Sequence, residues 1–259
     1  MDKLARHDAI VALLARAGRV SVTQLAAELN VTTETVRRDL AMLEREGRID
    51  RVHGGALLPR AATVPETDLR QRQQQAAAEK AAIAAATVTA LQLPPGTSLI
   101  LDAGSTTQAV ARCLPPDLTL TIITNSPIVA HELAATAARR ANPTAHPWDI
   151  IMLGGRIRGV TQAAVGASTV LAATALRVDL AVLGTNGYTP ARGFTTPDPD
   201  EAAVKQAFAA AARRTVVVTD SSKFGQEHLV SFLSPTTTDL LVTDQAPSEN
   251  PHGMEIVTP

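Results

Sequence analysis

Residues 20–56 read VSVTQLAAELNVTTETVRRDLAMLEREGRIDRVHGGA, and this stretch decides the fold of the first part of the chain. Apolar residues recur at helical spacing on both sides of a short turn at Asn30, which indicates two amphipathic helices. Ser21 is suited to cap the first helix, and Thr32 or Thr33 the second, because their hydroxyls accept from free backbone N–H groups. Two short helices joined by a tight turn are the helix-turn-helix arrangement.

The flanking residues extend this arrangement in both directions. Residues 2–17 predict a longer amphipathic helix. RIDRVHGGALL (48–58) predicts a β-hairpin wing that turns at His53–Gly55. We therefore predict a winged helix-turn-helix domain over residues 1–58. The alternative is a plain three-helix bundle whose arginines form a solvated face.

The second helix of such a pair enters the major groove of DNA, where its first turns face the base edges. Arginine binds guanine or phosphate there, and threonine binds phosphate or contacts a thymine methyl group. On the helix, the residues that we predict to contact double-stranded operator DNA are Thr33, Glu34, Thr35, Arg37 and Arg38. On the wing, where contacts would be to the DNA backbone or the minor groove, they are Arg48, Arg51 and His53.

The overall charge is nearly neutral. The formal net charge is −1, and residues 1–58 hold nine basic and eight acidic side chains. A basic excess often marks a nucleic-acid-binding protein. The prediction of DNA binding therefore depends on where the arginines lie and not on their total.

The composition also limits where the chain works. Charged residues interrupt the apolar positions of the first 19 residues, which is unlike a signal peptide, and no apolar run is long enough to span a bilayer. Cys113 is the only cysteine, so an internal disulfide is excluded, and we expect its thiol to be packed. We expect a cytoplasmic protein with no membrane contact.

The rest of the chain alternates strands with helices. Residues 59–78 are polar and proline-containing and predict a linker, and residues 79–259 form the second domain. Short apolar strands are predicted at 97–102, 118–124, 148–154, 178–184, 214–220 and 240–244. Apolar strands that alternate with helices favour an α/β fold with a mostly parallel sheet covered on both faces.

Small and polar residues gather where these strands end. They are Asp102–Thr107, Thr124–Ser126, Gly154–Gly155, Gly184–Gly187 and Asp220–Lys223. Ligands of parallel sheets bind at the carboxyl ends of the strands. Five polar loops at one edge therefore predict a polar pocket.

The loop DAGSTT (102–107) points to a phosphate. Gly104 allows close approach of a ligand, three hydroxyl residues follow, and the next helix presents free N–H groups. The alternative is that Ser105 or Thr106 only caps this helix. The loop lacks the lysine of a P-loop and the glycines of a dinucleotide fold, so it does not indicate a nucleotide.

Glu201 and Lys205 lie one turn apart on a predicted helix. One interpretation is an ordinary ion pair on the helix surface. The other is that both side chains bond sugar hydroxyls or phosphate at the rim of the pocket.

The chain resembles the DeoR family of bacterial transcription regulators. TVRRDL with the RVHGGA wing carries the resemblance in the first domain, and LDAGSTT, TNS, LGG, RGFTTPDPDEAAVK and DSSKFG carry it in the second, over residues 3–244. The resemblance implies a repressor controlled by a phosphorylated sugar, with a second domain similar to sugar-phosphate isomerases. It places Arg37 and Arg38 on the recognition helix.

The resemblance also implies the residues of the effector site. The phosphate loop would be Asp102, Gly104, Ser105, Thr106 and Thr107. The remainder would be lined by Asn125, Gly154, Asn186, Glu201, Lys205, Asp220 and Lys223. Many relatives have Gly-Ala-Asp-Gly where this chain has Gly184-Thr185-Asn186-Gly187, and an asparagine cannot act as a base.

Two functions remain open at this point. The first is a regulator of a sugar-metabolism operon that is not an enzyme. The second is an active sugar-phosphate isomerase with an accessory DNA-binding unit, in which Glu201 is the general base. Asn186 and the first domain favour the regulator. The histidines are scattered, so we expect no metal and no cofactor. We expect at least a dimer, because one winged helix contacts too few base pairs for specificity.

Overall fold

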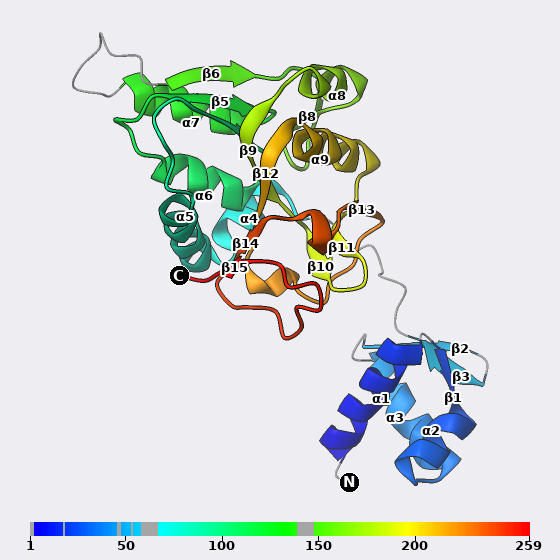
Figure 1. Cartoon of the computed structure of the whole chain (residues 1–259). Helices are drawn as coiled ribbons and strands as arrows, with labels where there is room; N and C mark the ends of the chain where they lie inside the picture. The colour runs from blue at the N-terminus through cyan, green and yellow to red at the C-terminus, as the bar shows by residue number, and fades with distance from the viewer. Residues whose placement is uncertain (1–2, 18, 46–47, 53, 58–66, 139–147) are drawn as a thin grey trace. The chain divides into compact units, whose positions relative to one another are not determined.

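The computed structural model describes residues 3–17, 19–45, 48–52, 54–57, 67–138 and 148–259 (Figure 1). The chain divides into two compact units, Met1–Val64 and Pro65–Pro259, and each is described by itself.

The first unit is a winged helix-turn-helix. Its elements are α1 (Lys3–Ala17), β1 (Arg19–Ser21), α2 (Val22–Leu29), α3 (Thr33–Arg45), β2 (Asp50–Val52) and β3 (Gly55–Leu57). The strands pair antiparallel in the order β1-β3-β2, and the β2–β3 hairpin is the predicted wing. Strand β1 was not predicted, because its pairing with β3 depends on a contact between residues far apart in the sequence. His53, in the predicted turn of the wing, lies outside the described residues.

Local capping sets the ends of α2 and α3. The Ser21 hydroxyl accepts from the Gln24 N–H at 3.2 Å, and the Gln24 side chain accepts from the Ser21 N–H at 3.0 Å, which forms a capping box. Asn30 ends α2 in the left-handed conformation, with φ of 53°. The hydroxyl of Thr32 accepts from the Thr35 N–H at 3.2 Å, so Thr32 caps α3.

A buried carboxylate ties α3 to α1. Arg6 donates to both oxygens of Asp39, from Nε at 2.6 Å and from Nη2 at 3.1 Å. The His7 Nε2 lies 3.1 Å from Asp39 Oδ1. Asp39 is buried beside the core of this unit. The apolar residues of that core are Ile10, Leu14, Val20, Leu25, Val36, Leu40, Leu43, Ile49 and Ala56.

The second unit is built on a seven-stranded parallel sheet. Its strands are β4 (Thr97–Leu101), β5 (Leu120–Thr124), β6 (Trp148–Met152), β9 (Val178–Gly184), β12 (Ala212–Val218), β14 (Leu240–Val242) and β15 (Ile256–Val257). Their order is β15-β14-β12-β9-β4-β5-β6, and every neighbouring pair is parallel. The predicted parallel sheet is confirmed.

Helices cover both faces of this sheet (Figure 1). On one face lie α5 (Ala77–Leu91), α6 (Ser105–Cys113) and α7 (Pro127–Ala138), and on the other lie α8 (Ala167–Thr174) and α9 (Pro199–Ala211). Side chains of a strand alternate between the faces. Thus Leu99 and Leu101 pack in the core between the sheet and α5, α6 and α7, and Ile100 packs in the core on the side of α8 and α9.

Several elements were missed from the sequence. Helix α4 (Leu69–Gln74) lies within residues 59–78, which we predicted as a linker. The Asp68 carboxylate caps it by accepting from the Gln71 N–H at 2.8 Å, and Leu69 is buried. This segment is polar, so only its tertiary packing distinguishes it from a linker. Five short antiparallel strands were also missed: β7 (Arg156–Arg158), β8 (Ala163–Val165), β10 (Gly187–Thr189), β11 (Gly193–Thr196) and β13 (Val230–Leu233).

Two further observations concern the exposure of Cys113 and the length of the apolar helices. Cys113 is exposed, so the expectation of a packed thiol was wrong, because the last turn of α6 turns this residue to solvent. Among the described residues, none of the helices is both long and apolar enough to cross a bilayer.

We predict that Asp39→Asn weakens the first unit by about 3 kcal/mol, because it removes one partner of a buried charge pair. Hydrogen exchange of the α3 amides in the full chain should then be about 100-fold faster. Glu44→Gln is the matched control, since Glu44 lies on the same helix and forms only an exposed ion pair with Arg51. Equal exchange in Asp39→Asn and wild type would contradict the prediction.

The same carboxylate predicts the acid lability of this unit. Burial raises the pKa of Asp39, but hydrogen bonds from Arg6 and His7 and their charges outweigh it, so the pKa lies below its usual value of 3.8. The stabilisation is therefore complete above about pH 3.8 and is lost as the pH falls through the lower, folded-state pKa. Asp39→Asn should remove this part of the acid dependence.

Candidate DNA-binding face and ligand pocket

The predicted DNA-contacting residues of the helix lie in the first turns of α3. Arg37 and Arg38 are exposed, with side-chain exposed fractions of 58% and 81%. Thr33 and Arg37 also line a groove with Arg51 of the wing strand β2. The helix and the wing therefore present basic side chains to one concave surface of this unit.

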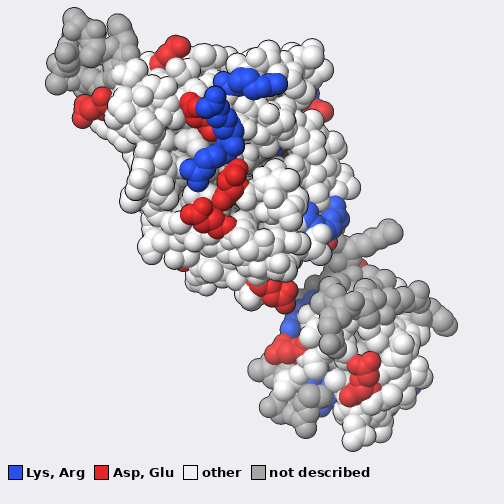
Figure 2. All heavy atoms as spheres, in the orientation of Figure 1, with Lys and Arg blue, Asp and Glu red and all other residues white. Residues whose placement is uncertain are grey.

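In the free protein these basic groups already have acidic neighbours. Glu34 lies 3.6 Å from both Arg37 and Arg38. Arg48 pairs with Asp8 at 2.8 Å, and Arg51 pairs with Glu44 at 3.5 Å. The charges are also mixed on the face of the second unit that Figure 2 shows, where acidic and basic side chains lie next to one another. DNA phosphates would have to replace the carboxylates of Glu34, Asp8 and Glu44. Recognition of DNA therefore depends on where the arginines lie more than on the total charge.

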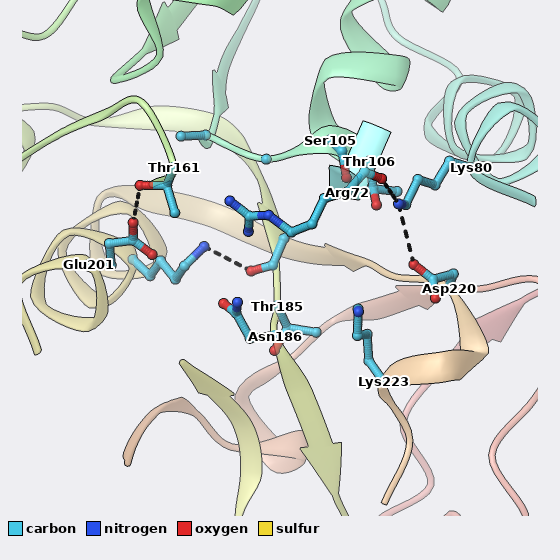
Figure 3. A pocket seen from close by; sticks show the side chains of 14 residues that line it. Arg72, Lys80, Ser105, Thr106, Thr161, Thr185, Asn186, Glu201, Asp220 and Lys223 are labelled. Carbon is cyan, nitrogen blue, oxygen red and sulfur yellow. Dashed lines mark hydrogen bonds and ion pairs between the residues drawn. The ribbon is translucent and has the colours of Figure 1, made fainter. Parts of the chain in front are cut away.

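The pocket of the second unit lies where the strand order reverses. From β4 the chain adds β5 and β6 on one side of the sheet, and then β9, β12, β14 and β15 on the other. The loops after β4 and β9 therefore diverge and leave a crevice between them. The pocket is lined by Arg72, Lys80, Ala103, Gly104, Ser105, Thr106, Thr161, Gly184, Thr185, Asn186, Glu201, Lys205, Asp220 and Lys223 (Figure 3).

The loop after β4 forms one wall of the pocket. Gly104 precedes α6, and a Cβ at this position would lie 3.2 Å from the Thr107 hydroxyl. The side chains of Ser105 and Thr106 lie at the pocket in Figure 3. At the start of α6 the first backbone N–H groups have no partners within the helix, and this end of the helix is the positive end of its dipole. This wall is suited to an anion.

Four of the predicted effector residues support the pocket from outside it. Asp102 is buried and pairs with Lys205, and Thr107 donates to the Gly104 carbonyl at 3.0 Å. Asn125 accepts from the Ala103 N–H and donates to the Ala164 carbonyl, both at 3.0 Å. The Gly154 carbonyl accepts from Thr169 at 2.8 Å. None of these four residues is among those that line the pocket, and their contacts hold the surrounding loops together.

Glu201 and Lys205 do not form a surface ion pair, so that interpretation was wrong. Both are buried in the wall formed by α9. Lys205 bonds Asp102 and donates to the Gly184 carbonyl at 2.9 Å. Glu201 accepts from Arg158 at 3.2 Å and from the Thr161 hydroxyl.

Arg72 and Lys80 were missed by the sequence analysis. The Arg72 side chain reaches from α4 into the middle of the pocket (Figure 3). Lys80 is buried, donates to the carbonyls of Arg72 and Gln75, and lies 3.9 Å from Asp220. Burial lowers the pKa of Lys80; Asp220 opposes this effect, and the charges of Lys223 and Arg72 add to it.

One signal in the sequence could have found Lys80. The chain has 24 basic residues, and only Lys3, Lys80, Lys205 and Lys223 are lysines. Three of these four line the pocket. In total, four basic and two acidic side chains line it, which favours an anionic ligand.

A winged helix-turn-helix followed by an α/β unit with a cation-lined pocket defines a transcription regulator with a sensor domain. The comparisons with known proteins agree with this class. Residues 6–61 match the DeoR-like helix-turn-helix domain, and residues 75–245 match the DeoR C-terminal sensor domain. The chain belongs to the DeoR family.

Named transcription regulators match nearly the full chain. The HTH-type transcriptional regulator GlpR of Haloferax volcanii is 36% identical, and the match covers 92% of this chain and 89% of the relative. The glycerol-3-phosphate regulon repressor of Escherichia coli is 32% identical over 95% of this chain and 93% of its own length. These similarities support DNA-binding regulation over isomerisation as the role of the chain.

A likeness to solved structures was also found. Ribose 5-phosphate isomerase A of Methanocaldococcus jannaschii is 17% identical, over 58% of this chain and 55% of its own, with a TM-score of 0.39. A likeness at this level carries no argument about catalysis.

We predict that Arg37→Ala or Arg38→Ala weakens operator binding by about 5- to 150-fold where the arginine contacts a base, equivalent to about 1–3 kcal/mol. The operator is a duplex that the protein itself selects from random sequence, and gel shift measures the affinity. Arg45→Ala is the control, because Arg45 lies in the last turn of α3. If both variants bind like wild type, α3 is not the recognition helix.

Proposed function

We propose that the protein represses an operon of sugar or polyol metabolism and that a phosphorylated sugar in the pocket releases it from DNA. The observation that carries this proposal is the pocket at the strand switch point, in which basic groups exceed acidic ones, in a chain with a DNA-reading helix. The candidate effectors are sugar phosphates such as fructose 1-phosphate and, because of the name of the Escherichia coli relative, glycerol 3-phosphate.

The pocket offers separate groups for the two parts of such a ligand. Ser105, Thr106 and the start of α6 would bind phosphate oxygens. Asn186 and Glu201, on the opposite side of the crevice, would bond hydroxyl groups of the sugar. A ligand without phosphate would leave the basic side chains unpaired and should bind poorly.

We propose that the pocket senses its ligand without converting it. A general base must take up a proton from the ligand, whereas a binding group only accepts a hydrogen bond from it. Glu201 already accepts from Arg158 and Thr161, and Asp102 is paired with Lys205. Asn186 cannot take up a proton. These contacts support a binding role for the acidic groups.

Control of DNA binding requires that the ligand binds the DNA-competent and incompetent states with different affinities. We predict that fructose 1-phosphate or glycerol 3-phosphate weakens operator binding by roughly 5- to 150-fold, a typical coupling. Fructose and glycerol should do little. Fluorescence anisotropy of a labelled operator measures the affinity, and NMR of the same samples should show no conversion of the sugar phosphate.

The matched variants separate the pocket from the DNA-binding face. The double variant Ser105→Ala with Thr106→Ala should still bind the operator, but the sugar phosphate should no longer lower its affinity for the operator. Ser168→Ala, an exposed hydroxyl on α8, should respond like wild type. A full response in the double variant, or steady isomerisation that Glu201→Ala abolishes, would contradict the proposal.

We also expect the protein to act as at least a dimer, since one winged helix gives too little specificity. The edge strand β6 exposes Ile151 and Met152, and an exposed apolar edge favours association. Light scattering on the protein–operator complex should give two or more chains. One chain per operator would refute the expectation.

A further inference from the structure

One edge of the Arg72 guanidinium group is buried. Its Nε and Nη2 are buried and have no hydrogen-bond partner among the described residues. These two nitrogens lie on the same edge of the guanidinium group and present parallel N–H donors that match two oxygens of one anion. The chain uses this edge elsewhere, where Nε and Nη2 of Arg6 hold both oxygens of Asp39.

The acidic groups near Arg72 are engaged with other residues. Asp220 lies beside Lys80 and accepts from the Ser222 hydroxyl. Glu201 is held by Arg158 and Thr161. Buried N–H donors without an acceptor are costly for the protein. The pocket therefore contains two parallel donors whose partner must come from outside the described chain.

Arg72 belongs to a short and lightly attached helix. Helix α4 has six residues. It is attached by the Leu69 N–H, which donates to the Val160 carbonyl at 3.1 Å, by Gln73, which donates to Gln108 at 2.7 Å, and by Lys80. Only residues 58–68 separate α4 from β3 of the DNA-binding unit. Within the part of the chain that the structure describes, α4 is thus the first helix or strand after the wing.

We propose that Arg72 binds the phosphate group of the effector through its Nε–Nη2 edge and that this contact stabilises helix α4. The inference rests on the proposed function. It adds a residue, Arg72, through which the ligand would act on helix α4, next to the segment that connects the two units. Six residues span about 9 Å as a helix and about 20 Å when extended. Ordering α4 therefore shortens the connection to the DNA-binding unit by roughly 11 Å.

The surrounding donors select phosphate over carboxylate. A carboxylate has two oxygens and one charge, which the Arg72 edge alone would satisfy. The hydroxyls of Ser105 and Thr106 and the ammonium groups of Lys80 and Lys223 lie in the same pocket. They supply donors for a third oxygen and balance a second charge, as a phosphate monoester requires.

The test uses the full chain with glycerol 3-phosphate and inorganic phosphate as probes, and glycerate as the carboxylate. Calorimetry measures affinity, and hydrogen exchange measures protection of the α4 amides. Wild type is compared with Arg72→Met, Arg72→Lys and the control Arg70→Met, which removes an exposed arginine from the same helix. Thermal unfolding of each ligand-free variant distinguishes a binding role from a structural one.

We expect glycerol 3-phosphate to protect α4 in wild type and in Arg70→Met. Arg72→Met should bind it about 10-fold more weakly or worse and show no protection, and Arg72→Lys should not restore it because lysine lacks the two parallel donors. Ligand-free Arg72→Met should unfold at the same temperature as wild type or higher.

Three results would overturn the inference. They are equal affinity in Arg72→Met and wild type, equal protection by glycerate, and a lower unfolding temperature for ligand-free Arg72→Met. The first two would leave the proposed function intact. If none of the probes and no phosphorylated sugar binds wild type, the proposed function itself fails.

Discussion

The buried ion pair between Lys205 and Asp102 fixes the geometry on which the pocket depends. Lys205 comes from α9 and Asp102 follows β4, and both also bond Gly184 at the end of β9, through its carbonyl at 2.9 Å and its N–H at 3.3 Å. Three elements far apart in the sequence are thereby joined at the point where the strand order reverses. The Lys205 ammonium also lies 5.3 Å from the centre of the Phe232 ring, which shields it from water. These contacts fix the ends of β4 and β9 and the wall formed by α9 relative to one another.

The arginines of the two units differ in burial and in their partners, and this difference fits the ligands that we propose for them. On α3, Arg37 and Arg38 are exposed and share Glu34 as a neighbour, so each can exchange a weak surface pair for a DNA phosphate at little cost. In the sensor unit, the Nε–Nη2 edge of Arg72 is buried without a partner among the described residues, and the proposed anion would supply one. A surface suited to a long DNA target and a pocket selective for a small anion therefore arise from the same side-chain type in different surroundings.

The sequence predicted the parts of the fold that carry a periodic signal. The stripes of α2 and α3, the caps at Ser21 and Thr32 and the apolar strands of the sheet followed from residue spacing, and so did the polar edge that contains Ser105 and Lys223. Helix α4 did not, because a single buried leucine in a polar stretch gives no periodicity. Its burial, and with it the position of Arg72, depends on contacts with distant residues such as Val160.

The motif DAGSTT identified the right loop but not the direction of each side chain. Ser105 and Thr106, in the first turn of α6, line the pocket, whereas Asp102 pairs with Lys205 and Thr107 bonds the Gly104 carbonyl. Asn125 likewise positions the loop through the Ala103 N–H. Sequence spacing places such residues at one edge, but only tertiary packing decides which of them a ligand can reach.

The central claim is that one phosphorylated ligand links the pocket to DNA. It is tested most directly by measuring, by calorimetry, the affinity for the effector of the free protein and of the protein saturated with its operator. Linkage requires two equal factors. Bound operator must lower the affinity for the ligand by the same factor by which bound ligand lowers the affinity for the operator. The account predicts equal factors, in the range of about 5 to 150. Equal ligand affinity in the free and operator-bound protein would contradict it.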